Sequence, residues 1–382
     1  MVKKIGVLTG GGDVPGLNAA IQELTVQGNR EGYEVIGIRR GWGGLIYMDP
    51  NDADINPQHA LILTPEIVRR IDREGGTFLH TSRINPEKAS ADRKFERYRG
   101  FTFEGKRNLT EDVQRNLKKM GIDAIIAIGG DDTLTYARYL AAMGFDVVGI
   151  PKTMDGDVYG AGECIGFSTA ITRSNEYITQ LRTPAGSHER VAVLEQFGRH
   201  SGLTALHSAL AANPDRVLIP EVPFDIGRVV ELIGRDYDAN PSQYAMLLVS
   251  EGAKPVGGYI VYQGDKKDQY GHQRLGGVGK QVSEAFNNAG FETIENPLTY
   301  SLRSGVPDAH DKILSRMYAH AAIDAIKRGK TGTLTARVDG SFTLVPLEIT
   351  KNSPLTVDVA EMYDIQQYRP KPAGFMEGGL LL

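Results

Sequence analysis

The feature that most constrains the fold is a regular alternation of short β-branched runs with amphipathic helical patterns. Seven apolar runs stand out: 5–8, 34–38, 124–130, 146–151, 190–195, 216–221 and 244–250. Several are apolar at consecutive positions, as strands buried on both faces are. The intervening segments 17–32 and 109–121 repeat apolar residues about every 3.6 positions. Such alternation predicts an α/β fold with mostly parallel sheets covered by helices on both faces.

Length and composition narrow the class of protein. At 382 residues the chain exceeds one ordinary domain, which predicts two domains sharing a cleft. With 43 basic and 47 acidic residues, its net charge of -4 argues against nucleic-acid or membrane-surface binding. The single cysteine, Cys164, excludes an intrachain disulfide, and we expect a small, partly buried side chain there. No run approaches the roughly 20 apolar residues of a membrane span, so we expect a cytoplasmic protein.

Three predicted strands end in sharp turns, at 9–18, 128–133 and 150–157. Ligands of open α/β sheets bind beyond the carboxyl ends of the strands, so these turns are expected to line one crevice. The first turn is rich in glycine, which lets the backbone and a helix N-terminus approach a phosphate.

The other two turns carry charged side chains. Asp131 and Asp132 could ligate Mg²⁺ carried by phosphates, or Asp132 and Thr133 could simply cap the next helix. The third turn contains a cation, a hydroxyl and two acids, which are the parts that phosphoryl transfer needs. These four residues are Lys152, Thr153, Asp155 and Asp157.

Two polar stretches are expected at the surface. Residues 85–112 are charged and rich in turn formers, typical of a solvated excursion or lid. Residues 253–280 are polar and rich in glycine, which predicts a long loop near the cleft.

These motifs, in their order along the chain, resemble the phosphofructokinase family that also contains the pyrophosphate-dependent enzymes. The matching segments are Gly11 to Asn18, Gly75 to Thr77 with Arg83, Gly129 to Asp131, Thr153 to Asp157, Glu195 to His200, Ser250-Glu251 and Arg303. The resemblance implies two Rossmann-like α/β/α domains, a donor domain of residues 1–166 plus 302–352 and a sugar-phosphate domain of 167–301 plus 353–382. The activity implied is Mg²⁺-dependent, reversible transfer of a phosphoryl group from pyrophosphate to the 1-hydroxyl of fructose 6-phosphate, giving fructose 1,6-bisphosphate and phosphate.

The resemblance also implies a role for each matching residue. Asp155 is the expected base, supported by Thr153, Lys152 and Asp157, and Asp131 is the expected magnesium ligand. Donor phosphates are expected at Gly11, Gly12, Arg83, Gly130, Asp132, Thr133 and Lys152. Besides Thr153 and Asp155, sugar-phosphate contacts are expected at Phe197, Gly198, Arg199, Glu251, Tyr300 and Arg303. Arg190 matches an arginine that serves the neighbouring subunit's site, which implies a homodimer or homotetramer.

Two positions favour pyrophosphate over ATP as donor. ATP-using relatives typically have glycine at the positions of Asp132 and Lys152. The Asp132 carboxylate would crowd and repel a nucleotide's α-phosphate. The Lys152 ammonium could instead hold the terminal phosphates of a donor without adenosine.

Other positions depart from the family pattern. Gly156 replaces a usual asparagine, which predicts a freer loop, and Phe197 replaces a methionine. Ile294 stands where a second phosphate-binding arginine is expected; Arg274 could compensate or be a solvated loop cation. Gln22 and Val26 replace effector-binding arginines, so effector control of that type is not expected.

Three alternatives therefore remain open. The same chemistry could act on another acceptor, such as sedoheptulose 7-phosphate or a polyol. The donor could be ATP. The chain could also be an inactive regulator that binds sugar phosphates, although Asp131, Thr153 and Asp155 speak against that.

Overall fold

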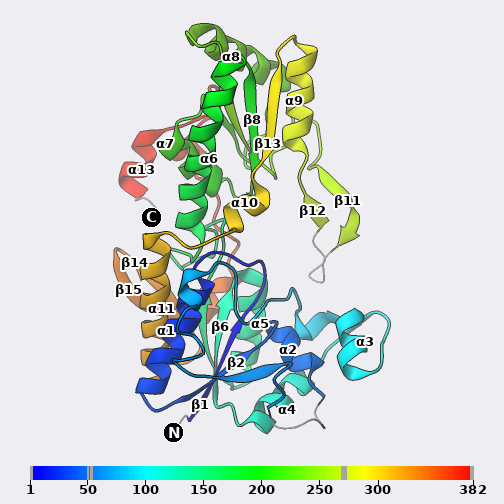
Figure 1. Ribbon diagram of the computed structural model, residues 1–382, viewed down its shortest axis with the longest axis vertical. Coiled ribbons are helices and arrows are strands. Elements are labelled where there is room, and N and C mark those ends of the chain that lie inside the picture. Colours follow the sequence, from blue (N-terminus) through cyan, green and yellow to red (C-terminus); the bar gives the residue numbers. More distant parts are fainter. Residues whose placement is uncertain (1–2, 50, 52–54, 268–272, 379–382) are drawn as a thin grey trace.

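The chain folds into two lobes, each built on its own β-sheet (Figure 1). The computed structural model describes residues 3–49, 51, 55–267 and 273–378. The first sheet contains, in spatial order, β15 (Ser341–Pro346), β14 (Thr333–Val338), β7 (Asp146–Pro151), β6 (Ala124–Gly129), β1 (Lys4–Thr9), β2 (Glu34–Ile38) and β3 (Ala60–Leu63). Pairing is parallel from β14 to β2, while the edge strands β15 and β3 are antiparallel to their neighbours.

Helices cover both faces of this sheet, as the alternation predicts. Successive residues of β1 point to opposite faces, so Val7 and Leu8 belong to two separate hydrophobic clusters. One cluster includes side chains of α1 (Leu17–Arg30) and α11 (Ala309–Lys327). The other includes side chains of α2 (Trp42–Tyr47), α4 (Thr110–Met120) and α5 (Asp131–Ala142).

The second lobe has a smaller, wholly parallel sheet. Its order is β13 (Thr293–Pro297), β8 (Val191–Gln196), β10 (Ala245–Ser250) and β9 (Arg216–Leu218). The helices of this lobe are α6 (Phe167–Ser187), α7 (Leu203–Ala212), α8 (Ile226–Ala239) and α9 (Val278–Asn288). The chain ends beside α7 with α12 (Val359–Met362), β16 (Tyr363–Asp364), β17 (Arg369–Pro370) and α13 (Pro372–Gly378) (Figure 1).

The α/β prediction is confirmed. Each of the seven apolar runs overlaps a strand, and the two amphipathic segments form α1 and α4. The division at residues 166, 302 and 352 stays a prediction. No helix among the described residues is both long and apolar enough to cross a bilayer.

Segment 85–112 lies mostly at the surface, as predicted, but it is folded onto the first lobe. It forms η2 (Pro86–Lys88), β4 (Ala89–Ser90), α3 (Arg93–Arg99) and β5 (Lys106–Arg107). Phe95 and Phe103 are buried, and both belong to the cluster shared with α2 and α4. Its few aromatic side chains thus pack the segment onto the first lobe.

Segment 253–280 is likewise more ordered than a loop. It contains an antiparallel hairpin of β11 (Tyr262–Lys267) and β12 (Gln273–Leu275), and it runs into α9. In Figure 1 the hairpin projects from the second lobe towards the first. The side chain of Arg274, the proposed substitute cation, lies outside what the structure describes.

Buried polar contacts tie the lobes together between α11 and α6. The Asp311 carboxylate, on α11, accepts hydrogen bonds from the backbone N–H groups of Gly166 and Thr169, at 2.8 Å each, and from the Thr169 hydroxyl. Asp308 caps α11 and accepts hydrogen bonds from Ser168 and Thr172. These contacts fix the N-terminus of α6 against the first lobe.

Candidate active site

The three glycine and proline turns come together at one edge of the first sheet, because β7, β6 and β1 are neighbours. The Gly10 N–H donates to the Ile128 carbonyl at 2.9 Å, and the Lys152 N–H donates to the Gly129 carbonyl at 3.0 Å. The buried Lys152 ammonium donates to the Gly12 carbonyl at 2.6 Å. The three turns therefore lie side by side at this edge, as the sequence predicted.

Glycine is needed where the first turn passes the second. A Cβ on Gly10 would lie 2.4 Å from the Thr133 hydroxyl oxygen, which excludes any side chain there. Gly11 has a φ of +82°, and its Cβ would lie 3.3 Å from the Lys152 Nζ. The buried Thr133 hydroxyl has no hydrogen-bond partner among the described residues.

The capping alternative for Asp132 and Thr133 is wrong. The N-cap of α5 is Gly130, and no side chain caps the helix. Both residues lie in the first turn of α5, as does Asp131. Capping therefore does not explain why these side chains lie at this edge.

The third turn is held rigidly. The Asp155 N–H donates to the Thr153 hydroxyl at 3.1 Å, and Thr204 of the second lobe donates to the Met154 carbonyl at 2.7 Å. Gly156 has a φ of +66°, and a Cβ there would lie 2.6 Å from the Phe167 ring. The ring and the left-handed backbone together favour glycine at this position, and the expectation that Gly156 gives a freer loop stays a prediction.

The second lobe contributes residues from the carboxyl ends of β8 and β10. The Glu251 N–H donates to the Gln196 carbonyl at 2.8 Å, which places Glu251 beside Phe197 and Gly198. A Cβ on Gly198 would lie 2.1 Å from the Ser250 hydroxyl oxygen. Glycine therefore lets the two strand ends approach closely enough to bring their side chains together.

Arg303, at the end of α10 (Thr299–Arg303), bridges the two lobes. Its guanidinium lies 4.6 Å from the centre of the Phe197 ring and 5.9 Å from that of Tyr300. One nitrogen lies 3.9 Å from the Asp13 carboxylate, and another would lie 3.2 Å from a Cβ on Gly12. Arg303 thus contacts the donor loop as well as the predicted sugar side, and Tyr300 is largely exposed.

The acids of the site have raised pKa values. Burial, followed by the charges of Asp157 and Asp132, raises the pKa of Asp131 to about 7. Burial, Asp157 and Glu251 hold the pKa of Asp155 well above its ordinary value, and burial also raises the pKa of Asp157. Burial is the largest cause in each case, and neighbouring carboxylates add to it at Asp131 and Asp155.

The cations of the site also influence one another. Burial, followed by the charges of Arg303 and Arg83, lowers the pKa of Lys152 to about 8. Burial raises the pKa of Glu251 to about 7 against the opposing charge of Arg199. Four basic side chains from both lobes therefore lie near the acids, an arrangement that suits anionic groups such as phosphates.

A magnesium ion fits this donor set. Asp157 is close enough to raise the pKa of Asp131, and carboxylate oxygens are the ligands that Mg²⁺ prefers. No cluster of three or more ligating side chains occurs in the described part of the chain. That count suits Mg²⁺, which is usually held by one or two carboxylates and by substrate phosphates.

Arg190 and Ile294, the two positions discussed above for further phosphate contacts, lie away from this site. Arg190 directly precedes β8, at the strand end opposite Phe197, and pairs with Glu292 at 2.8 Å. Ile294 lies within β13, paired with Ala192, and packs against the hydrophobic core. Cys164 is buried, and burial raises its thiol pKa, so a reactive role is not supported.

Three structural residues near the site were not predicted: Asp13, Asp308 and Asp311. Asp13 sits in the matched glycine turn, but only the fold shows its approach to Arg303. The acids at 308 and 311 show a recognisable pattern, since an acid three residues after an N-cap acid favours a helix start.

A family model described as phosphofructokinase matches residues 4–326. The chain belongs to the phosphofructokinase family. It is 39% identical over 336 residues to the pyrophosphate–fructose 6-phosphate 1-phosphotransferase of Amycolatopsis methanolica, covering 87% of this chain and 90% of that protein. It is also 36% identical over 356 residues to ATP-dependent 6-phosphofructokinase 3 of Streptomyces coelicolor, covering 93% and 96%. The chain is therefore a phosphofructokinase whose named relatives differ in their donor.

Solved phosphofructokinases share the fold. The pyrophosphate-dependent phosphofructokinase of Marinobacter aquaeolei superposes with a TM-score of 0.77 at 17% identity, covering 99% of this chain and 92% of that one. The phosphofructokinase of Saccharomyces cerevisiae superposes with a TM-score of 0.72 at 25% identity, covering 91% of this chain and 45% of that one. The two-lobed α/β architecture is thus that of the family.

Proposed function

We propose that this phosphofructokinase uses pyrophosphate, with Mg²⁺, to phosphorylate the 1-hydroxyl of fructose 6-phosphate reversibly. The observation that carries the choice of donor is that Asp132 and Lys152 both occur at the turns beside the glycine loop. Lys152 is buried, and its ammonium reaches the Gly12 carbonyl. A buried cation at this point needs an anionic partner, and the terminal phosphates of a small donor supply one.

Asp132 supports the same donor because its carboxylate would repel the additional phosphate of a nucleotide. It lies one residue after Asp131 in the first turn of α5, and its charge helps to raise the pKa of Asp131. A third phosphate brought to this position would meet an additional negative charge beside the acids Asp131 and Asp157. Pyrophosphate avoids this repulsion because its charge stays beside Lys152, Arg83 and the glycine backbone.

Asp155 is the proposed base. Its raised pKa makes it a stronger proton acceptor than an ordinary aspartate, while Arg303 and Arg199 favour its ionised form. The proton of the sugar hydroxyl would pass to the Asp155 carboxylate as the oxygen attacks the donor phosphorus. Thr153 and Asp157 position this turn, and Lys152 would balance charge on the transferred group.

The Thr133 hydroxyl and the backbone at Gly11, Gly12 and Gly130 would hold the donor. Thr133 is buried with no partner among the described residues, which suits a donated hydrogen bond to a phosphate oxygen. Asp131, with Asp157 close by, would hold Mg²⁺. When bound, that ion would supply positive charge to the transferring phosphoryl group.

The sugar phosphate would lie against the second lobe. Phe197 and Gly198 offer a shaped surface, Glu251 an acceptor for sugar hydroxyls, and Arg199 and Arg303 charge for the 6-phosphate. Ile294 offers no charge, and its partly buried side chain packs against the core. Another acceptor, such as sedoheptulose 7-phosphate or a polyol, is the alternative to test first.

Arg190 supports the proposal of an oligomer. It stands about 23 Å from Phe197 along β8, at 3.3 Å per residue, so it cannot reach its own chain's site. Any substrate phosphate that Arg190 contacts would therefore be bound in the site of a second copy of this chain. We expect a homodimer or homotetramer acting in the cytoplasm.

A donor-by-acceptor matrix tests the donor and the sugar together. Purified protein with Mg²⁺ would receive pyrophosphate or ATP, each with fructose 6-phosphate, sedoheptulose 7-phosphate or a polyol. We expect turnover with pyrophosphate and fructose 6-phosphate. Turnover with ATP alone would favour the second candidate, an ATP-dependent enzyme, which the relative from Streptomyces coelicolor supports by name.

A double substitution tests the reason for the donor choice. In Asp132→Gly with Lys152→Gly, the excluding carboxylate and the buried ammonium are both lost. We expect kcat/KM for pyrophosphate to fall by more than about tenfold, since a charge-assisted contact is removed, and some ATP turnover to appear. Absence of any ATP turnover in the double variant would show that other residues exclude the nucleotide.

A further inference from the structure

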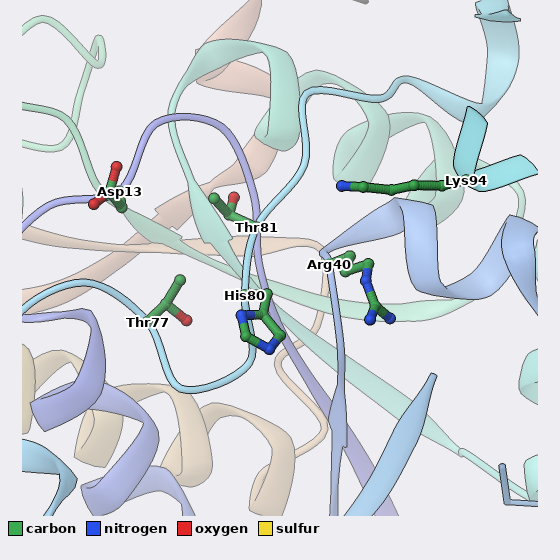
Figure 2. A pocket seen from close by; sticks show the side chains of 6 residues that line it. All are labelled: Asp13, Arg40, Thr77, His80, Thr81 and Lys94. Carbon is green, nitrogen blue, oxygen red and sulfur yellow. The ribbon is translucent and has the colours of Figure 1, made fainter. Parts of the chain in front are cut away.

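A pocket beside the donor loop contains none of the residues assigned to the substrates above. It encloses about 440 Å³ and is lined by Asp13, Arg40, Thr77, His80, Thr81 and Lys94 (Figure 2). Thr77, His80 and Thr81 belong to the segment that leads to Arg83, Arg40 follows β2, and Lys94 lies on α3. The pocket thus joins the catalytic edge of the sheet to segment 85–112.

The lining carries uncompensated positive charge. Lys94 makes no hydrogen bond or ion pair with any described residue, and Figure 2 shows its ammonium extending from α3 towards the 77–83 segment. Arg40 is held in place by a 2.6 Å hydrogen bond to the Gln58 carbonyl and by the Tyr98 ring, and neither contact neutralises it. The one acid, Asp13, is already 3.9 Å from Arg303.

His80 adds a neutral donor to the pocket. Its Nε2 lies 2.8 Å from an Arg39 guanidinium nitrogen, and a guanidinium can only donate. Nε2 must therefore accept, which puts the proton of the neutral ring on Nδ1. Burial, Arg39, Arg40 and Lys94 all lower the pKa of His80, in keeping with this neutral form.

His80 is also conformationally unusual. Its φ of +56° places a residue other than glycine in the left-handed region, and its carbonyl accepts a hydrogen bond from the Thr9 hydroxyl at 3.0 Å. Residues held in such conformations concentrate at binding sites. The strain therefore points to a functional reason for the position of the imidazole.

The pocket is connected directly to the donor loop. The Thr81 hydroxyl donates to the Gly11 carbonyl at 2.7 Å, and the Gly11 N–H donates to the Ser82 carbonyl at 3.0 Å. Asp13 itself belongs to the loop. A group bound in the pocket would therefore lie next to the phosphates of the donor.

We propose that this pocket binds a phosphate group alongside the donor site. Two cations and an N–H donor, with the only acid paired elsewhere, match the charge and acceptor oxygens of phosphate. The group could be free inorganic phosphate, or the third phosphate of inorganic tripolyphosphate whose other phosphates occupy the donor site. This proposal rests on the proposed function for the identity of the neighbouring donor.

The test measures phosphate binding by isothermal titration calorimetry. The full-length protein is first saturated with methylenediphosphonate, which occupies the donor site without reacting, and is then titrated with inorganic phosphate. We expect binding that weakens about tenfold in Lys94→Gln, the loss of one charge-assisted contact. Lys106→Gln is the matched control, because Lys106 is an exposed lysine of the same segment outside the pocket.

Kinetics distinguish the two sources of the phosphate group. If the third phosphate of tripolyphosphate binds here, Lys94→Gln lowers kcat/KM for tripolyphosphate relative to pyrophosphate, and Lys106→Gln does not. If free phosphate binds here, that ratio is unchanged while the Kd for phosphate rises. Either pattern supports the pocket as a phosphate site.

Equal phosphate affinity in wild type and Lys94→Gln, together with an unchanged donor ratio, would overturn the proposal. So would an absence of phosphate binding to the diphosphonate-saturated wild type. Failure of the proposed function gives a different result. The wild type would then use ATP and not pyrophosphate, and a titration without diphosphonate would still report whether phosphate binding depends on Lys94.

Discussion

At the residue scale, the site combines acids that hold their protons with a lysine that readily loses one. Both shifts have the same first cause, which is burial of charged groups where the lobes meet. Neighbouring charges then shift the pKa of Asp131 in opposite directions: Lys152 favours its ionised form, and Asp157 opposes it. Small changes in one side chain should therefore alter the protonation of its neighbours.

Replacing the proposed base should abolish most of the turnover. In Asp155→Asn the amide cannot accept the hydroxyl proton, so we expect kcat to fall by about 10² to 10⁴, the usual contribution of a general base. The KM for the donor should stay close to that of wild type. Steady-state kinetics beside Asp238→Asn, an exposed acid on α8, would check this. Equal loss in both variants would remove Asp155 from the mechanism.

The pH profile of kcat/KM should be bell-shaped. Asp155 must be ionised to act as a base, so the rate is lost as pH falls through its raised pKa. Lys152 must be charged, so the rate is lost as pH rises through about 8. In Lys152→Arg the charge persists, and the alkaline limb should move up by more than about one pH unit. An unmoved limb would assign it to another group.

At the element scale, the junction of α11 and α6 supports the site from behind. The Asp311 carboxylate, wholly buried, satisfies N–H groups at the N-terminus of α6, and burial raises its pKa to about 6. Helix N-termini otherwise leave such groups without partners. The same helix start adjoins the Phe167 ring that constrains Gly156.

Asp311→Asn should therefore destabilise the protein. Both carboxylate oxygens accept backbone N–H groups, and an amide keeps only one acceptor, so one buried N–H loses its partner. We expect a loss of about 1–3 kcal/mol in the free energy of unfolding, measured by urea denaturation. Asp324→Asn, an exposed acid on the same helix, should stay within about 0.5 kcal/mol of wild type. An unchanged midpoint in Asp311→Asn would contradict the structural role.

At the scale of the whole molecule, each site depends on both sheets of its own chain and, as proposed, on a second chain. Arg303 contacts Phe197 in one lobe and the donor loop in the other. Thr204 fixes the third turn across the same gap. Arg190 faces away from this gap, which is why we assign it to a neighbour.

Mixed oligomers test that assignment. Asp155→Asn chains keep Arg190, and Arg190→Gln chains keep Asp155. When the two inactive variants are refolded together, we expect activity to recover, since some sites receive Asp155 from one chain and Arg190 from another. The control mixes each variant with chains that carry both Asp155→Asn and Arg190→Gln, because those mixtures lack either every Asp155 or every Arg190 and should stay inactive. No recovery, with oligomers confirmed by light scattering, would place Arg190 outside the site.

Much of the architecture could be predicted from the local sequence. Seven strands of the two main sheets are continuous apolar runs, and all seven were predicted because such runs can be recognised without knowing their partners. The other four strands of these sheets, β3, β13, β14 and β15, were not predicted. Three of them, β3, β13 and β15, are edge strands, where sequences such as TIENP in β13 are mixed and pairing is decided by the neighbouring strand.

The sequence by itself determined the alternation of strands and helices, the turns expected at one edge of the sheet, the residue types for phosphate chemistry and the family. Tertiary structure alone decided how these residues meet: Lys152 on the Gly12 carbonyl, Arg303 against Phe197, and Gly156 under the Phe167 ring. It also decided the packing of segment 85–112 and the cationic pocket that this segment completes. The reason is physical. Propensity and periodicity act over a few residues, whereas burial, distance and charge coupling depend on segments far apart in the chain.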